Sequence, residues 1–357
     1  MTAFGVMMVI SATGRESDVG LAAEARAQIL WWAVSAGACL IAWRMPFTWW
    51  RELAIPGYIA ALVVILGMIA LAGTGLVPNT KGQANWIVIG PLRVQPVEFI
   101  KIAALLGTAL LMTAPGFDAR RFSHVLLALV IAGLPAAMLA KEDLGSALTF
   151  VPMAFGILTV AGLRLRHLAI LGLITLTVAA AGIAALPKEG AKAYQYKRIQ
   201  AWLHPDQYAL TEGYQTARSV SAIGSGQWVG KGWTQGDQNR LGMIPEKHTD
   251  LIFAVTGEEL GLLGTLSVIG LFVTFAWVGL ANASAARDSC GRYVVVGYVS
   301  LVCGQAAINL AVATGLMPVT GVTLPFFSYG GSSLLGMWLG LGIACSAATT
   351  RPPGAQT

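Results

Sequence analysis

The chain has 357 residues, of which 56 % are hydrophobic and only 11 % are charged, and its mean hydropathy is +0.68. Soluble domains keep roughly a quarter of their residues charged, so this composition excludes an ordinary soluble protein and indicates a polytopic membrane protein. Because lipid cannot satisfy open backbone groups, we expect the membrane spans to be helices.

Ten apolar segments, most of them long enough to cross a bilayer, follow one another along the chain. They predict one all-α membrane domain, residues 1–357, with about ten transmembrane helices. The segments lie near residues 1–13, 27–43, 54–73, 96–114, 122–140, 145–162, 167–187, 250–281, 293–315 and 325–348. The first is too short to span from Met1, so we expect an incomplete helix or a true start upstream. A cleaved signal peptide is not favoured, because the stretch has no basic n-region.

Arginines gather in one set of loops and set the predicted orientation. If there are ten spans, the loops on one side carry arginine pairs, and these are Arg44 with Arg51, Arg120 with Arg121, Arg164 with Arg166 and Arg287 with Arg292, followed by Arg351 in the tail. By the positive-inside rule this side is cytoplasmic, as are both termini. The net charge of +6 therefore reflects topology and does not indicate nucleic-acid binding.

One connection, residues 188–249, is long and would form a large extracytoplasmic loop between spans seven and eight. Its cations, among them Arg198 and Arg218, alternate with Tyr and Trp residues, a mixture that the headgroup layer favours. We expect a folded cap on the outer surface, with a short helix in "EGYQTARSVSAIGSG". A shorter external connection, "GTGLVPNTKGQANWIVIGPLRVQP", is expected to be rich in turns.

The sequence predicts no nucleotide cofactor and leaves a divalent cation open. The stretch "GSGQWVGKG", which contains Lys231, misses the spacing of both the phosphate loop and the dinucleotide motif. A flexible loop that offers its lysine and backbone N–H groups to an anion and a plain tight turn both remain open. Asp250, Glu258 and Asp143 offer oxygen ligands that suit Mg²⁺ or Mn²⁺, although the pattern does not require a metal.

Two further charged motifs lie at outer ends of predicted spans. Glu98 and Lys101, in "VQPVEFIK", share one face of a helix. They could form an ion pair that makes both tolerable, or Lys101 could meet a phosphate near the outer surface, which we favour. In "AKEDLGSAL", Asp143 could serve a substrate or could simply cap the helix that begins at Leu144.

The stretch "GMIPEKHTDLIFAVTGEELG", residues 242–261, crowds charges beside an apolar run, where burying them is costly. Thr249 or Asp250 could cap the helix that follows. Asp250 also stands where an external loop meets the membrane, beside Lys247 and His248. Its carboxylate could take a proton from a substrate held at the lipid surface.

Together and in order, these segments resemble the SEDS proteins (shape, elongation, division and sporulation) over almost the whole chain. The resemblance is carried by "QPVEFIK", "EDLGSAL", "SAIGSGQWVGKGW", "IPEKHTDLIFAVTGEELG" and "GVTLPFFSYGGSS". The third stretch resembles the RodA branch, used in cell elongation, more than the FtsW branch, used in division. Asn85 departs from the family pattern, which often has Arg there.

This resemblance implies a peptidoglycan glycosyltransferase at the outer face of the bacterial cytoplasmic membrane, acting in elongation and cell shape. Its substrate would be lipid II, a disaccharide-peptide on undecaprenyl diphosphate, and its partner would be a class B penicillin-binding protein. Asp250, in the family's H-T-D motif, would be catalytic. The expected substrate-binding residues are Glu98, Lys101, Asp143, Arg198, Arg218, Lys231, Lys247, His248 and, in "PFFSYGGSS", Ser328.

Three other functions remain open at this point. A transporter or lipid II flippase usually needs polar groups near the bilayer midplane, whereas the ionisable residues here gather at outer helix ends and in the external loop. A division-type, FtsW-like polymerase would share the chemistry and differ in cellular role. A non-catalytic scaffold, recruiting synthases through its helix faces, would not need Asp250.

Overall fold

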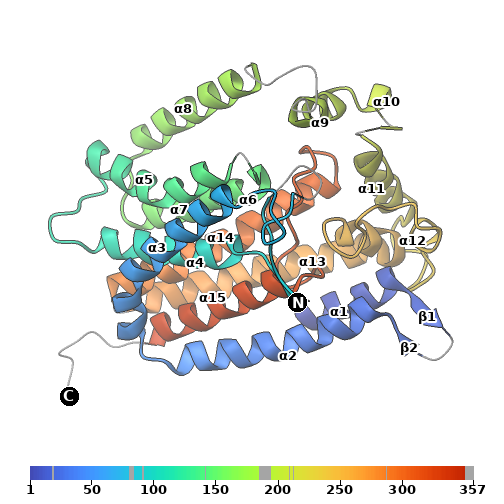
Figure 1. Cartoon of the computed structure of the whole chain (residues 1–357), viewed down its shortest axis with the longest axis horizontal. Helices are drawn as coiled ribbons and strands as arrows, with labels where there is room; N and C mark the ends of the chain where they lie inside the picture. Colours follow the sequence, from blue (N-terminus) through green and yellow to red (C-terminus); the bar gives the residue numbers. More distant parts are fainter. Residues whose placement is uncertain are drawn as a thin grey trace.

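The computed structural model describes residues 1–17, 20–79, 84–90, 92–140, 142–184, 194–208, 210–211, 213–286 and 288–349. A helix lies in each of the ten predicted spans, although residues 185–187 of the seventh lie outside the described residues, and these helices form one bundle (Figure 1). These helices are α1 (Thr2–Thr13), α2 (Ala23–Arg44), α3 (Phe47–Ala70), α4 (Val97–Met112), α5 (Phe122–Leu139), α6 (Leu144–Leu148) with α7 (Phe150–Val160), α8 (Leu165–Ala184), α13 (Ile252–Ala285), α14 (Ser289–Ala313) and α15 (Gly331–Thr349).

Six of these helices, α2, α3, α5, α13, α14 and α15, are long and apolar enough to cross a membrane. The predicted all-α membrane fold is therefore confirmed, while the count of ten spans stays a prediction. The span expected at 325–348 starts too early, because α15 begins at Gly331. The preceding residues form a turn in which the Ser328 hydroxyl accepts a hydrogen bond from the Leu324 amide at 2.9 Å.

Two antiparallel hairpins stand outside the bundle. One joins β1 (Arg15–Ser17) to β2 (Gly20–Leu21), and the other joins β3 (Ile87–Ile89) to β4 (Leu92–Val94). The second hairpin lies in the connection expected to consist of turns, where "IVI" and "LRV" pair in register. Short β-branched runs can form a ladder once a turn brings them together.

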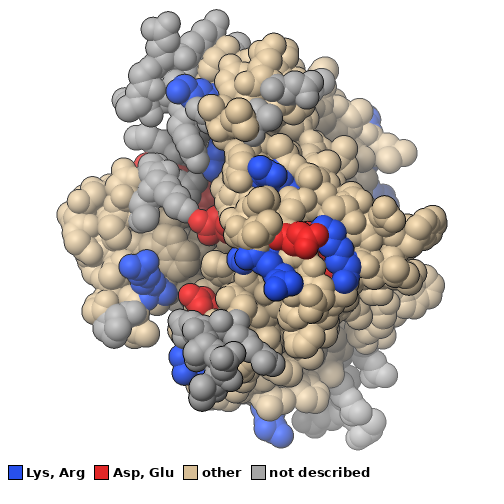
Figure 2. All heavy atoms as spheres, turned by 90° about the vertical axis from the view of Figure 1, so that its right-hand side faces the viewer, with Lys and Arg blue, Asp and Glu red and all other residues tan. Residues whose placement is uncertain are grey.

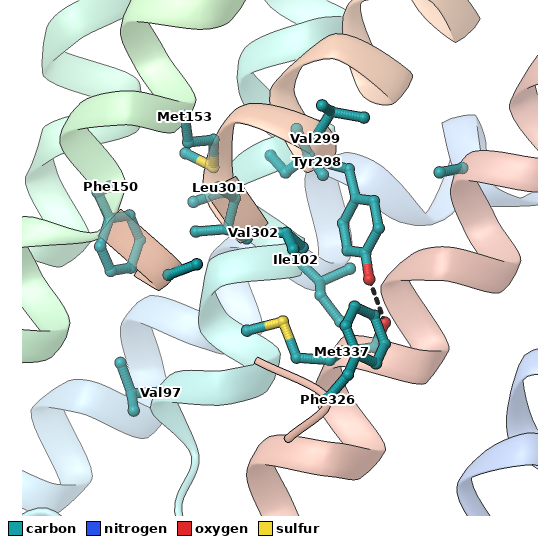
Figure 3. Close-up of a cluster of buried hydrophobic side chains, with 14 of the residues drawn as sticks. Val97, Ile102, Phe150, Met153, Tyr298, Val299, Leu301, Val302, Phe326 and Met337 are labelled. Carbon is teal, nitrogen blue, oxygen red and sulfur yellow. Dashed lines mark hydrogen bonds between the residues drawn. The ribbon is translucent and has the colours of Figure 1, made fainter. Parts of the chain in front are cut away.

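Helices α14 and α15 are the most enclosed part of the bundle, with 61 % of each apolar window buried, against at most 28 % for the other four spans. Between them, the buried Tyr298 side chain donates its hydroxyl hydrogen to the Met337 carbonyl (Figure 3). Gly340 lies against the ring of Tyr298, and Gly336 lies against Glu98 of α4. The G-x-x-x-G pair thus allows close helix packing, as expected.

The described part of residues 188–249 forms four short helices at one end of the bundle (Figure 1). These are α9 (Tyr194–Leu203), α10 (Pro205–Tyr208), α11 (Tyr214–Ser225) and α12 (Asp237–Arg240). Helix α11 is the one predicted from "EGYQTARSVSAIGSG". Figure 2 looks at this end and shows a hollowed face with acidic side chains at the margin of the hollow and basic ones around it.

Candidate functional site

A loop of the cap breaks α13 at Gly261, whose φ of 64° and ψ of −157° are not helical. Residues 226–232 fill the break and exchange backbone hydrogen bonds with the helix. The amides of Lys231 and Gly232 donate to the carbonyls of Glu258 and Glu259, and the amides of Leu262 and Leu263 donate to the carbonyls of Gln227 and Trp228, at 2.8–3.1 Å. Of the two interpretations left open for this loop, the one in which its amides point at an anion is therefore wrong for the N–H groups of Lys231 and Gly232.

Glu258 is fully buried and holds the cap onto the helix. Its carboxylate accepts hydrogen bonds from Lys231 Nζ at 2.9 Å, from the Gln238 amide at 2.8 Å and from the Asn239 amide at 3.0 Å. The hydrogen bond to Glu258 is the largest cause that raises the pKa of Lys231, with Asp237 adding to it and partial burial opposing it. The Lys231 ammonium therefore contacts Glu258 and Asp237 and helps to hold the cap on the helix.

Glu259, also fully buried, ties the cap to the first helix. Its carboxylate accepts hydrogen bonds from Ser11 Oγ of α1 at 2.7 Å, from Asn239 Nδ2 at 2.8 Å and from the Thr234 amide at 3.1 Å. A buried carboxylate is stable only when its oxygens are satisfied in this way. Glu258 and Glu259 thus hold the cap against α13 and α1, and we call these two residues with their hydrogen-bond donors the clamp. This structural role explains part of the charge crowded into residues 242–261.

A metal centre built from Asp250 and Glu258 does not fit these residues. The Glu258 oxygens already accept three hydrogen bonds inside the clamp. Within the described ranges, no three His, Cys, Asp or Glu side chains lie together as a metal-binding group.

Asp250 lies just before α13. The N-cap position is Leu251, one residue after Asp250 and two after Thr249, where the sequence predicted the cap. The Asp250 side chain is partly exposed. Its Oδ2 lies 3.8 Å from the point where a β-carbon on Gly321 would stand, so the carboxylate faces the open side of that glycine.

Residues 319–322 form a segment around which three of the predicted site residues meet. Arg198 of α9 donates from Nη1 to the Val319 carbonyl at 3.0 Å. Asp250 faces Gly321, as described, and the start of α6 packs on the Thr320 carbonyl through Gly145. The structure therefore brings Arg198, Asp250 and the α6 start, with Asp143 as its cap, to one place.

Asp143 is buried and acts as the N-cap of α6, which confirms the capping interpretation. Its carboxylate accepts hydrogen bonds from the Ser146 amide at 2.9 Å and from Asn85 Nδ2 at 3.0 Å. Asn85, which replaces a frequent Arg of the family pattern, thus donates to this same carboxylate. Together these bonds fix the α6 start against residues 319–322.

Glu98 and Lys101 form a buried ion pair of 2.8 Å beneath the same segment. Lys101 is 1 % exposed and also donates to Gln305 Oε1 at 2.9 Å, and Gln305 Nε2 donates to the Thr323 carbonyl at 3.0 Å. The ion-pair interpretation is thus confirmed, and in this structure the Lys101 ammonium is directed at protein groups.

Lys247 and His248 lie at the junction of the cap with the bundle. The His248 carbonyl accepts from the Tyr329 amide at 2.8 Å, and the two rings meet edge to face at 5.5 Å. Burial lowers the pKa of His248 and favours the neutral ring. Lys247 donates to the Asn239 carbonyl at 2.7 Å, and burial is the main cause that lowers its pKa.

Ser328 and Arg218, which the sequence predicted to bind substrate, both make contacts within the protein that give them a structural role. Ser328 is buried, and its hydroxyl closes the turn before α15. The Arg218 guanidinium stacks over the Tyr214 ring at 5.1 Å within α11. Neither contact links these side chains to Asp250.

The sequence reasoning missed Asn309 and Gln305, which connect α14 to the site. Asn309 Nδ2 donates to the Asp250 carbonyl at 2.8 Å and to the Val322 carbonyl at 2.7 Å. The two amides are four residues apart, on one face of α14. A signal existed, since side-chain amides inside an otherwise apolar span need partners within the bundle.

The comparisons with known proteins agree with this architecture. The family model FtsW/RodA/SpoVE, described as cell cycle protein, matches residues 1–352. The probable peptidoglycan glycosyltransferase FtsW of Geobacter metallireducens is 34 % identical over 98 % of this chain and 92 % of its own length. The peptidoglycan glycosyltransferase MrdB of Escherichia coli K12 is 33 % identical over 81 % of this chain and 77 % of its own length.

A solved structure is also similar. One chain of a peptidoglycan synthase complex, described for its structural coordination of polymerization and crosslinking, matches with a TM-score of 0.76 and 28 % identity over 97 % of this chain and 94 % of that one. The expected SEDS resemblance is confirmed, whereas relatives from both branches leave the RodA-like assignment a prediction. The chain belongs to the FtsW/RodA/SpoVE family of cell cycle proteins.

Proposed function

We propose that this chain is a peptidoglycan glycosyltransferase that polymerises lipid II into glycan strands at the outer face of the bacterial cytoplasmic membrane. The observation that carries the proposal is the position of Asp250, whose partly exposed carboxylate faces Gly321 beside Arg198. The names of two relatives, both peptidoglycan glycosyltransferases, support it.

Asp250 is the general base in this proposal. The acceptor hydroxyl attacks the anomeric carbon of the donor sugar, and its proton passes to the Asp250 carboxylate. The bond from that carbon to the diphosphate oxygen breaks, and the electron pair leaves with the lipid diphosphate. An α-linked diphosphate that gives a β-linkage is inverted, which calls for a base on the acceptor side. Such a base typically contributes about 10²–10⁴-fold in rate.

Arg198 is the cation that we assign to the departing diphosphate. Its guanidinium contacts Val319, two residues from the glycine that Asp250 faces. A planar guanidinium suits phosphate oxygens, and fixed charge at the leaving group stabilises the transition state. Lys101 and Lys231 are held by buried carboxylates instead, so we assign them the support of the site.

We propose the cellular setting on three grounds. We propose a class B penicillin-binding protein as the partner, supported by the similar chain of a complex in which polymerization and crosslinking are coordinated. The arginine-bearing ends of the helices lie opposite the cap, which supports cytoplasmic termini and an extracytoplasmic site. The "AIGSG…GKGW" stretch supports a role in elongation.

The test is polymerisation of fluorescent lipid II by purified protein, with and without the partner, for the wild type and for Asp250→Asn. We expect at least a 10²-fold loss of rate in the variant with an unchanged melting temperature, because asparagine keeps the shape of the side chain and one acceptor oxygen. If the variant polymerises lipid II at the wild-type rate, Asp250 is not the general base. Transbilayer movement of labelled lipid II without polymer would indicate a flippase instead. Removal of Mg²⁺ and Mn²⁺ with EDTA in the same assay tests whether polymerisation requires a divalent cation.

A further inference from the structure

Four exposed arginines lie at the end of the bundle opposite the cap. Arg120 and Arg121 precede α5, and Arg164 and Arg166 flank the start of α8. Residues 113–124 and 161–167 contain four arginines and one aspartate, Asp118, which leaves a net charge of +3. Asp118 lies 3.9 Å from the Arg121 guanidinium in an exposed pair, and such pairs contribute little.

The starts of α5 and α8 lie together, so the arginines of both connections form one cluster. The rings of Phe122 and His167 are in contact, with centroids 5.4 Å apart. His167 is 3 % exposed, and its Nδ1 has no hydrogen-bond partner in the part of the chain that the structure describes. We call Arg120, Arg121, Arg164 and Arg166 the arginine cluster.

An apolar crevice of about 140 Å³ lies between α5, α7 and α8, within one to two helical turns of the Phe122–His167 contact. Its lining includes Leu129, Gly133, Ala136, Phe150, Phe155 and Leu171. Leu129 follows Phe122 by two helical turns on one face, and Leu171 follows His167 by one turn. The crevice therefore continues from the arginine cluster toward the middle of the bundle, where α8 diverges from the other helices (Figure 1).

We propose that the arginine cluster and the crevice together bind an anionic phospholipid of the cytoplasmic leaflet. The phosphate of the headgroup is held by the guanidinium groups, and one acyl chain lies in the crevice. Basic groups at this side of a bundle, next to a space between helices, match the charge and the shape of such a lipid. This site is separate from the one proposed for Asp250.

The position of the charge decides between this lipid and the polyprenyl chain of the substrate. A lipid-linked glycan at the outer face has its diphosphate at the cap end, beside Arg198. The arginine cluster lies at the opposite end and so has no role in holding that diphosphate. A phospholipid of the inner leaflet, by contrast, places its phosphate at the cluster while its chain enters the crevice.

The experiment is native mass spectrometry of the full-length protein with dioleoyl phosphatidylglycerol and with dioleoyl phosphatidylethanolamine, which has the same chains and no net charge. We expect preferential retention of phosphatidylglycerol by the wild type. Arg164→Gln with Arg166→Gln should weaken that retention about fivefold for each arginine removed. Arg44→Gln, an exposed arginine at the end of α2 on the same side, is the matched control and should change nothing.

A second variant tests the crevice itself. A β-carbon on Gly133 would meet open space and Gly133 lines the crevice, so Gly133→Leu places a side chain in the crevice and should reduce retention of both lipids. The proposal is overturned if the two lipids bind equally, if Arg44→Gln has the same effect as the cluster variant, or if Gly133→Leu has none.

Discussion

The side-chain nitrogen of Asn309 joins the backbone of Asp250 to that of Val322, at 2.8 and 2.7 Å. Asn309 is 1 % exposed, so it holds the start of α13 against the 319–322 segment from inside the bundle. An amide NH₂ suits this place because it offers two donors and carries no charge. It positions Asp250 through the backbone, without using the carboxylate.

Replacing Asn309 should therefore lower the polymerisation rate without any direct contact to the substrate. Asn309→Leu removes both donors and leaves two carbonyls unsatisfied, which should cost about 1–3 kcal/mol of unfolding free energy. Misplacing Asp250 by about 1 Å should lower kcat roughly 10²-fold, with little change in KM for lipid II.

Asn309→Asp tests how close position 309 lies to the Asp250 carboxylate. It also loses both donors, and it adds a negative charge next to Asp250. Since a like charge disfavours an ionised carboxylate, the acid limb of the pH–rate profile should move to higher pH in Asn309→Asp and stay in place in Asn309→Leu. Equal profiles for the two variants would show that a charge at position 309 does not act on the catalytic base.

Two glycines of one loop provide a matched pair for the role of Gly321. Gly321 and Gly315 have φ values of 76° and 77°, so alanine should cost about 1–2 kcal/mol at either position. Only the new methyl group of Gly321→Ala would face Asp250 Oδ2, at 3.8 Å. A methyl group on Gly315 would also crowd Thr216 and Val220 at 3.3 Å, so we expect Gly315→Ala to melt no higher than Gly321→Ala. Only Gly321→Ala should lose activity, measured by lipid II polymerisation. A similar loss in Gly315→Ala would assign the effect to backbone strain.

The fold was largely predictable because apolar length and arginine position report directly on membrane helices. The break in α13 was not, because it depends on a loop that lies about 30 residues earlier in the chain and donates its amides to Glu258 and Glu259. Glu259 and Ser11 are separated by 248 residues. No local pattern contains such a contact.

The candidate site likewise combines features that local sequence rules predict with features that depend on tertiary contacts. The carboxylate that meets a local rule, Asp143 before the α6 start, does cap that helix. The predicted cap at Thr249 or Asp250 is displaced, because the backbone continues in turns up to the N-cap Leu251 and the helix begins at Ile252. Asn309 of α14 contacts the Asp250 backbone there, and no local capping rule contains such a tertiary contact.

The two acidic partners of Lys231 should differ widely in their effect on stability. Glu258 is fully buried, whereas the Asp237 side chain is 70 % exposed, and both lie within 3.0 Å of Nζ. Glu258→Gln removes the charge from a buried cluster of three donors and should lower the unfolding free energy by about 1–3 kcal/mol. Asp237→Asn should cost no more than about 1 kcal/mol. Thermal unfolding and limited proteolysis of the cap check this, and equal effects would contradict the clamp.

His248 should make the stability of the protein fall under mildly acidic conditions. Burial lowers its pKa from the ordinary 6.5, with Glu246 and Glu24 opposing the shift in part. Above pH 6.5 the ring is neutral in both the folded and the unfolded chain. As the pH falls below 6.5, the unfolded chain takes up a proton that the folded protein takes up only at lower pH, so unfolding is favoured.

His248→Phe keeps a ring against Tyr329 and removes the titration, so its melting temperature should fall less between pH 7.5 and pH 5 than that of the wild type. His204→Gln, at an exposed histidine, is the control and should follow the wild type. Parallel curves for His248→Phe and the wild type would show that protonation of His248 has no part in the acid sensitivity.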